Sequence, residues 1–130
     1  MLSREQVERL IRCAKMGDYI SYRENPELAV LMTLMFYAPM KLVDAQRITI
    51  ENLQSGTYVS KKRGEVHFTL PEEQMKYLSF YIHAARIRNG EPLLSNTKRA
   101  FDKIFRKIAE TEGIEARLSD VYYLGEKENR

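Results

Sequence analysis

Hydrophobic positions recur at helical spacing along most of the chain. The first stripe of this kind comprises Val7, Leu10, Ile11 and Ala14. Ser3 and Gln6 form the capping-box pattern that opens a helix, so a helix is expected to start here. Residues 27–38 differ, because apolar side chains surround the helix axis almost completely. Since a helix that is apolar on all sides is a buried one, this second helix is predicted to lie at the centre of the domain.

The remaining pattern alternates between extended and helical stretches. Residues 57–60 and 66–70 are β-prone and flank a basic turn, which is typical of a β-hairpin. Further helices are expected at 40–46, 71–88 and 97–112. The predicted fold class is therefore mainly α with one small antiparallel β-hairpin or sheet.

The composition is that of one globular domain. The chain has 130 residues, of which 44% are hydrophobic and 30% are charged. We expect a single domain over residues 1–125, followed by a polar tail over residues 126–130. The longest apolar run, residues 28–40, is interrupted by Thr33 and Pro39 and is too short to span a bilayer. No membrane partner is therefore expected.

Few residues offer cofactor chemistry. Cys13 is the single cysteine and cannot form an internal disulfide, which favours an intracellular location in the cytoplasm or nucleoid. Two histidines and one cysteine are too few for a zinc cluster, and the glycines are scattered rather than gathered in a phosphate loop. No cofactor and no metal site are therefore expected. The net charge of +3 permits nucleic-acid binding without requiring it.

One segment carries a resemblance to a known family. Residues 37–44 read Tyr-Ala-Pro-Met-Lys-Leu-Val-Asp and follow the buried helix, and residues 48–51 read Ile-Thr-Ile-Glu. Together with the order of helices and hairpin, this stretch resembles the catalytic domain of the tyrosine recombinases, the phage-integrase family. The resemblance covers residues 3–116. It implies a recombinase-like fold, DNA as the partner, and a site where arginines clamp a DNA phosphate that a tyrosine attacks.

The chain departs from the family pattern at the residues that carry this chemistry. Lys41 stands where the resemblance places the first arginine, and an ammonium lacks the bidentate fork of a guanidinium. Residues 117–124 contain no His-x-x-Arg segment, and Tyr122 and Tyr123 come too early to be the nucleophile. The candidates for the family's hairpin lysine are Lys61 and Lys62. We interpret the chain as a degenerate and truncated relative that is not an enzyme and has no catalytic residues.

Three groups of cations are the candidate DNA contacts. They are Lys41, the hairpin tip Lys61, Lys62 and Arg63, and the helix stripe Arg99, Lys103 and Arg106. Lys41 could instead form a surface ion pair with Asp44, three positions later. The tip and the stripe could equally be solvated surfaces. If these cations bind DNA, we expect contacts to phosphates, which supply affinity rather than sequence specificity.

The leading hypothesis is a non-catalytic DNA-binding domain related to the tyrosine recombinases and hence to DNA recombination. The alternative is a protein–protein interaction module that keeps the recombinase scaffold. In that case self-association or a protein partner would use Tyr77, Phe80 and Tyr81, since tyrosine is enriched at interfaces, although the same three residues could instead belong to the core. A second alternative is a fragment of a larger, active recombinase or integrase. Lys41 speaks against it, because a longer chain would not restore the first arginine.

Overall fold

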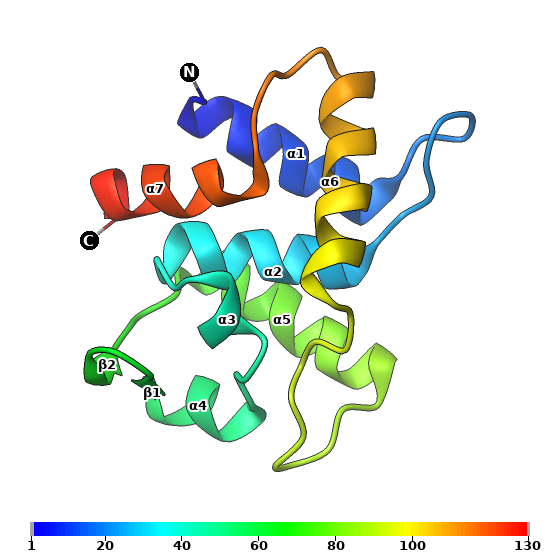
Figure 1. The fold of residues 1–130 in the computed structure, drawn as a ribbon. Helices are drawn as coiled ribbons and strands as arrows, with labels where there is room; N and C mark the ends of the chain where they lie inside the picture. The colour runs from blue at the N-terminus through cyan, green and yellow to red at the C-terminus, as the bar shows by residue number, and fades with distance from the viewer. Residues whose placement is uncertain (1, 130) are drawn as a thin grey trace.

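Residues 2–129, which the computed structural model describes, form seven helices and one two-stranded hairpin (Figure 1). In chain order the elements are α1 (Arg4–Met16), α2 (Pro26–Tyr37), α3 (Leu42–Ala45), α4 (Ile50–Ser55), β1 (Thr57–Ser60), β2 (Gly64–His67), α5 (Glu72–Ala85), α6 (Lys98–Thr111) and α7 (Leu118–Asn129). The predicted class, mainly α with one small antiparallel hairpin, is confirmed. No helix within these residues is long and apolar enough to cross a membrane.

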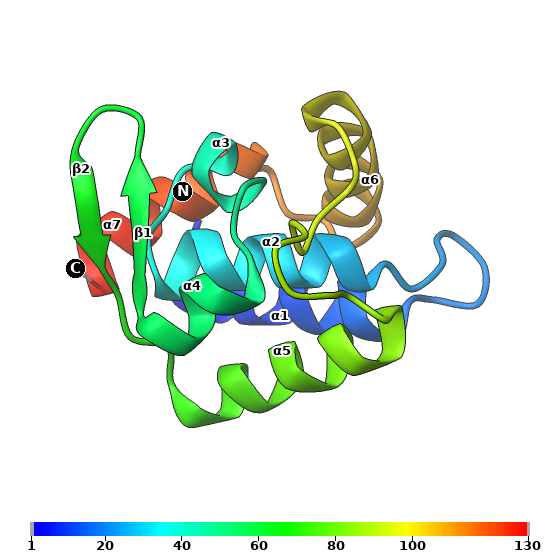
Figure 2. The same ribbon diagram turned by 90° about the horizontal axis from the view of Figure 1, so that it is seen from below.

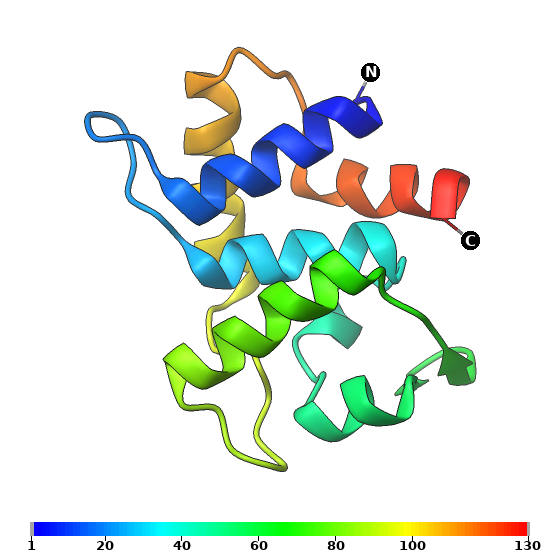
Figure 3. The ribbon, with the colours of Figure 1, turned by 180° about the vertical axis from the view of Figure 1, so that it is seen from behind.

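Helix α2 is the centre of the domain, as its apolar pattern predicts. Every residue from Leu28 to Tyr37 is buried. Helices α1, α5, α6 and α7 pack around α2, and α1 and α5 lie on either side of it when the molecule is seen from behind (Figure 3). Asn25 caps its start by accepting a hydrogen bond from the Leu28 backbone N–H at 2.9 Å, and Pro26 occupies the first turn. Burying this helix on all sides contributes hydrophobic stabilisation to the fold.

The hairpin is short and strictly paired. Its register matches Thr57 with His67 and Ser60 with Gly64. Strand β1 is anchored to the core through Tyr58, which is buried and lies 5.8 Å from the ring of Phe68. The turn between the strands is fully exposed, so its charged side chains extend into solvent.

Helix α7 has no counterpart among the predicted elements. It runs through residues 126–129, which were expected to form a polar tail, while residue 130 lies outside the described part. The helix approaches α2 so closely that a Cβ added at Gly125 would lie 2.5 Å from the backbone oxygen of Phe36. The Asn129 side-chain amide also donates to that oxygen at 3.0 Å. Packing against α2 therefore accounts for helix α7, which the local sequence pattern does not predict.

The elements are arranged so that one side of the domain carries the basic segments. Figure 2 shows the hairpin tip, α3 and α6 projecting on one side of α2, with α5 on the opposite side. In Figure 1 the same three elements face the viewer, with α3 between the hairpin and α6. This side is called the basic face below, and it is defined by the hairpin tip, the N-terminus of α3 and the exposed surface of α6.

Candidate nucleic-acid interface

Lys41 lies at the centre of the basic face. Helix α2 ends at Tyr37, and the chain turns so that Lys41 precedes α3 in an extended conformation with its side chain exposed. Within the described residues it forms no ion pair with Asp44, which is only 4% exposed. The Lys41 Nζ atom lies instead 5.8 Å from the centre of the Tyr122 ring. The surface ion pair considered from the sequence is therefore not formed, and the charge of Lys41 is directed over an aromatic ring.

Asp44 is buried although it carries a carboxylate. It lies in α3, and its backbone N–H donates to the Lys41 carbonyl at 3.0 Å. Its Oδ1 atom is buried and accepts no hydrogen bond from any described residue. Since a buried carboxylate oxygen without a donor destabilises the folded state, this residue is an exception to the usual pairing of buried polar groups.

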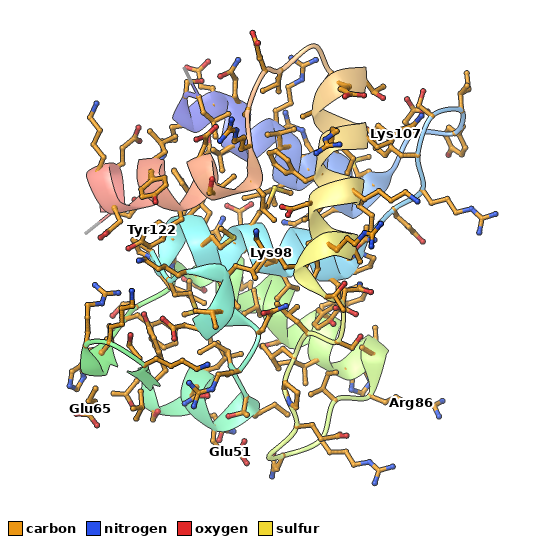
Figure 4. All side chains as sticks on the ribbon, viewed as in Figure 1. Glu51, Glu65, Arg86, Lys98, Lys107 and Tyr122 are labelled. Carbon is orange, nitrogen blue, oxygen red and sulfur yellow. The ribbon has the colours of Figure 1, made fainter. Side chains whose placement is uncertain are left out.

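A pocket of about 560 Å³ opens beside Lys41, between α3, α6 and α7. Its charged lining comprises Lys41, Lys98, Arg106, Arg117 and Asp102. The aromatic lining comprises Tyr122 and Tyr123. Figure 4 labels Lys98 on α6 and Tyr122 on α7, the two helices that contribute to this pocket. Four cations and one carboxylate give this pocket an excess of positive charge, which favours an anionic ligand.

The stripe on α6 continues this pocket outward. Its members Arg99, Lys103 and Arg106 are exposed and form no ion pair with another described residue. The one ion pair on this helix joins Lys98 to Asp102 at 3.8 Å, within the part of the chain that the structure describes. The stripe lines a second, open depression next to the first, because Lys98, Asp102 and Arg106 contribute to both. The predicted stripe is thus a continuous cationic surface.

The hairpin tip forms the opposite border of the basic face. Lys61, Lys62 and Arg63 are all exposed, and none of them is ion-paired within residues 2–129. The nearby Glu65 instead lies 3.4 Å from His67. All seven predicted contact residues therefore belong to elements that project on one side of the domain (Figure 2).

The aromatic face proposed on α5 does not exist as predicted. Tyr81 is buried, its hydroxyl donates to the Leu93 carbonyl at 2.7 Å, and burial raises the pKa of Tyr81 to about 12. Tyr77 is half-buried, with the Lys15 Nζ atom 4.1 Å from the centre of its ring. Phe80 alone of the three is well exposed, at 68%. Helical spacing could not distinguish these cases, because the group that receives the Tyr81 hydroxyl lies in the loop after the helix.

Comparison with known proteins identifies the fold. No protein-family model matches the sequence, and no curated protein matches it. Among solved structures, the crystal structure of XerA recombinase is similar to this chain, with a TM-score of 0.69 at 15% sequence identity. The fold is that of part of a recombinase. The match covers 94% of this chain and 46% of the XerA chain, so this chain spans less than half of its structural relative.

The recombinase-like fold brings together two segments that are far apart in the sequence. Lys41 stands at the position that the resemblance gives to the first arginine, and residues 117–124 stand where it would place His-x-x-Arg. Both segments line the same pocket. Among the pocket residues that the sequence did not assign are Lys98, Arg117, Tyr122 and Tyr123. Lys98 and Arg117 could have been predicted as site residues, because they are cations that border the predicted segments. No feature of the sequence other than their position pointed to the two tyrosines.

Proposed function

We propose that this protein is a non-catalytic DNA-binding domain that contacts the phosphate backbone through its basic face. The observation that supports this most strongly is the common orientation of the hairpin tip, Lys41 and the α6 stripe, shown in Figure 2. An exposed, unpaired cation can neutralise a DNA phosphate. This releases a counterion condensed on the DNA, and that release contributes to the affinity. DNA is also the partner that the recombinase-like fold makes plausible.

The proposal that the domain is not an enzyme rests on the chemistry of the pocket. Lys41 offers a point charge where bidentate phosphate binding needs a guanidinium. The Tyr122 hydroxyl donates to the Glu126 carboxylate at 2.6 Å, so it is engaged within α7. Clamp, proton-transfer groups and nucleophile act as a unit, so a partial set gives little catalysis.

A salt titration of duplex binding tests the DNA-binding proposal. Fluorescence anisotropy of a labelled duplex should show a linear fall of log affinity with log salt, with a slope of about −0.9 for each phosphate neutralised. Changing Lys61, Lys62 and Arg63 together to Ala should flatten the slope by roughly two to three units. The matched control removes three exposed charges, Lys76, Arg86 and Arg88, from α5 and the loop after it. If the control flattens the slope as much, or if the wild-type protein shows no slope, the proposal fails.

Activity is tested separately with a suicide DNA substrate and a denaturing gel. We expect no covalent protein–DNA adduct. An adduct that disappears in Tyr122→Phe or Tyr123→Phe would instead support the alternative of an active recombinase fragment. Because this assay scores a covalent bond, its result does not depend on the salt titration.

A protein-interaction module remains the second candidate function, and a different surface favours it. The loop between α1 and α2 presents Tyr19 and Ile20 almost completely to solvent. The loop is preformed, since the Asp18 carboxylate accepts backbone hydrogen bonds from Ile20 at 2.6 Å and from Ser21 at 2.8 Å. If this loop is the functional surface, Tyr19→Ser with Ile20→Ser should abolish partner binding, and the changes on the basic face should have no effect.

A further inference from the structure

Tyr123 is an exposed aromatic residue inside a cationic pocket. Its side chain is 63% exposed, although Tyr122 beside it is buried. The two rings are 5.3 Å apart in an edge-to-face arrangement with an interplanar angle of 65°. Most of the exposed large apolar side chains lie elsewhere, but Tyr123 and the partly exposed Val43 both line this pocket. The pocket therefore combines an accessible ring with positive charge.

The ring of Tyr123 is held in place by its contact with Tyr122. Tyr122 packs against it and is itself fixed, because its hydroxyl donates to Glu126 and Lys41 lies over its ring. Both tyrosines lie in α7, which approaches α2 closely at Gly125. A ring that is ordered before a ligand arrives loses little side-chain entropy on binding, so it is a suitable stacking platform.

The charges around this ring suit phosphates. Lys41, Arg106 and Arg117 line the pocket, while Lys98 is paired with Asp102 on the same wall. The volume of about 560 Å³ lies within the range of sites that hold one small molecule. One nucleotide fits such a space, whereas a base pair within a duplex has its faces covered by its neighbours and cannot stack on a protein ring.

We propose that this pocket binds an unpaired nucleotide, with the base stacked on the Tyr123 ring and the adjoining phosphates held by Lys41, Arg106 and Arg117. This inference rests on the proposed nucleic-acid binding and specifies its target. A continuous duplex uses only the cations of the basic face. Single-stranded DNA, or a duplex with an unpaired base, uses the ring as well, and stacking on an aromatic side chain contributes about 1–3 kcal/mol per base.

The test compares Tyr123→Leu, which removes the ring and keeps apolar bulk, with Tyr123→Phe, which keeps the ring. The probes are a labelled oligothymidylate of about ten nucleotides, a length within the range of single-strand binding sites, and a duplex of equal length. Tyr123→Leu should weaken binding of the single strand by roughly 5-fold to 150-fold, which is that stacking energy expressed as an affinity ratio. It should leave duplex binding unchanged. Tyr123→Phe should leave both affinities unchanged.

A fluorescent base reports the stacking itself. When 2-aminopurine replaces one thymine, its emission should be quenched by the wild-type protein and by Tyr123→Phe, and should stay unquenched with Tyr123→Leu. Phe80→Leu is the matched control, because Phe80 is an exposed aromatic residue of α5, and α5 lies on the opposite side of α2 from the elements of the basic face (Figure 2). Thermal unfolding of each variant verifies that it is folded.

Two results would overturn the inference. One is duplex binding with a steep salt slope but equal single-strand affinity for wild type and Tyr123→Leu, which would leave the DNA-binding proposal intact. The other is an equal loss on both probes, which would make Tyr123 a general contact. Absence of salt-dependent binding to either probe would remove both proposals together.

Discussion

Helices α1 and α6 are both amphipathic and basic, but their basic side chains differ in whether they contact other groups of the protein. Both pack against α2, and both carry more cations than carboxylates. On α1, Arg4 lies 3.4 Å from Glu128, Arg9 lies 2.8 Å from Glu112, and Lys15 lies over the Tyr77 ring. On α6, the stripe of Arg99, Lys103 and Arg106 has no such partner within residues 2–129. A count of charges treats the two helices alike, whereas the fold pairs Arg4, Arg9 and Lys15 with groups of the protein and leaves the α6 stripe unpaired within residues 2–129.

The largest effects should come from the buried faces, where the two helices are equivalent. Leu10 on α1 and Phe105 on α6 are both buried. Leu10→Ala should cost about 2–5 kcal/mol and Phe105→Ala about 3–5 kcal/mol, because each loses apolar burial and leaves a cavity. Denaturant unfolding measures both. Met16→Ala, at an exposed position of α1, is the control and should change stability by no more than about 0.5 kcal/mol.

A smaller but more discriminating effect should separate their charged faces. Changing Arg99, Lys103 and Arg106 to Ala should flatten the salt slope of duplex binding by up to about 2.7 units and leave stability almost unchanged. The matched change of Arg4, Arg9 and Lys15 to Ala should leave the slope almost unchanged and lower stability, since the two exposed ion pairs contribute about 0.2–1 kcal/mol each and Lys15 loses its contact with the Tyr77 ring. Equal changes in slope for the two triple variants would contradict the comparison.

A third prediction concerns the carboxylate that engages α1. Glu112 accepts hydrogen bonds from Arg9 Nη2 at 2.8 Å and from the Tyr22 hydroxyl at 3.2 Å. Glu112→Gln should therefore lower the free energy of unfolding by about 1 kcal/mol. A double-mutant cycle with Arg9→Met measures the coupling of the pair by thermal unfolding. Strict additivity of the two changes would show that the pair contributes nothing.

The smallest effect is expected at the one ion pair of α6. Lys98 is well exposed and Asp102 is partly exposed, so Asp102→Asn should change stability by no more than about 0.5 kcal/mol. It should steepen the salt slope by up to about 0.9, because Lys98 becomes available to a phosphate. Glu110→Gln, on the same helix but outside the pocket, changes the net charge equally and should leave the slope unaltered. Equal slopes for the two variants would place Lys98 outside the interface.

Much of the fold could be predicted from local pattern. Residues 28–37 carry apolar side chains on all sides of the helix axis, which predicts a buried central helix. The β-prone runs on either side of residues 61–63 predict the hairpin. Helix α7 could not be predicted in this way, because Gly125 weakens a helix in isolation. Its glycine is required by the close approach to the Phe36 backbone, which is visible only in the folded structure.

The site was predictable in part. Exposed cations such as Lys62 and Arg99 follow from composition and helical spacing. The pocket does not, because it forms only where α7 brings Tyr122 and Tyr123 beside Lys41. Tyr81 could be placed neither in the core nor on a partner surface, because sequence spacing does not reveal the Leu93 carbonyl that accepts its hydroxyl.

The contact between α2 and α7 also constrains how this protein is made. Helix α7 covers one side of α2, but it is synthesised roughly eighty residues after α2. Until then, this apolar side of α2 stays exposed on the nascent chain. Chaperone binding to residues 28–37 should therefore persist until α7 has left the ribosome. A glycine at position 125 then lets the two backbones meet.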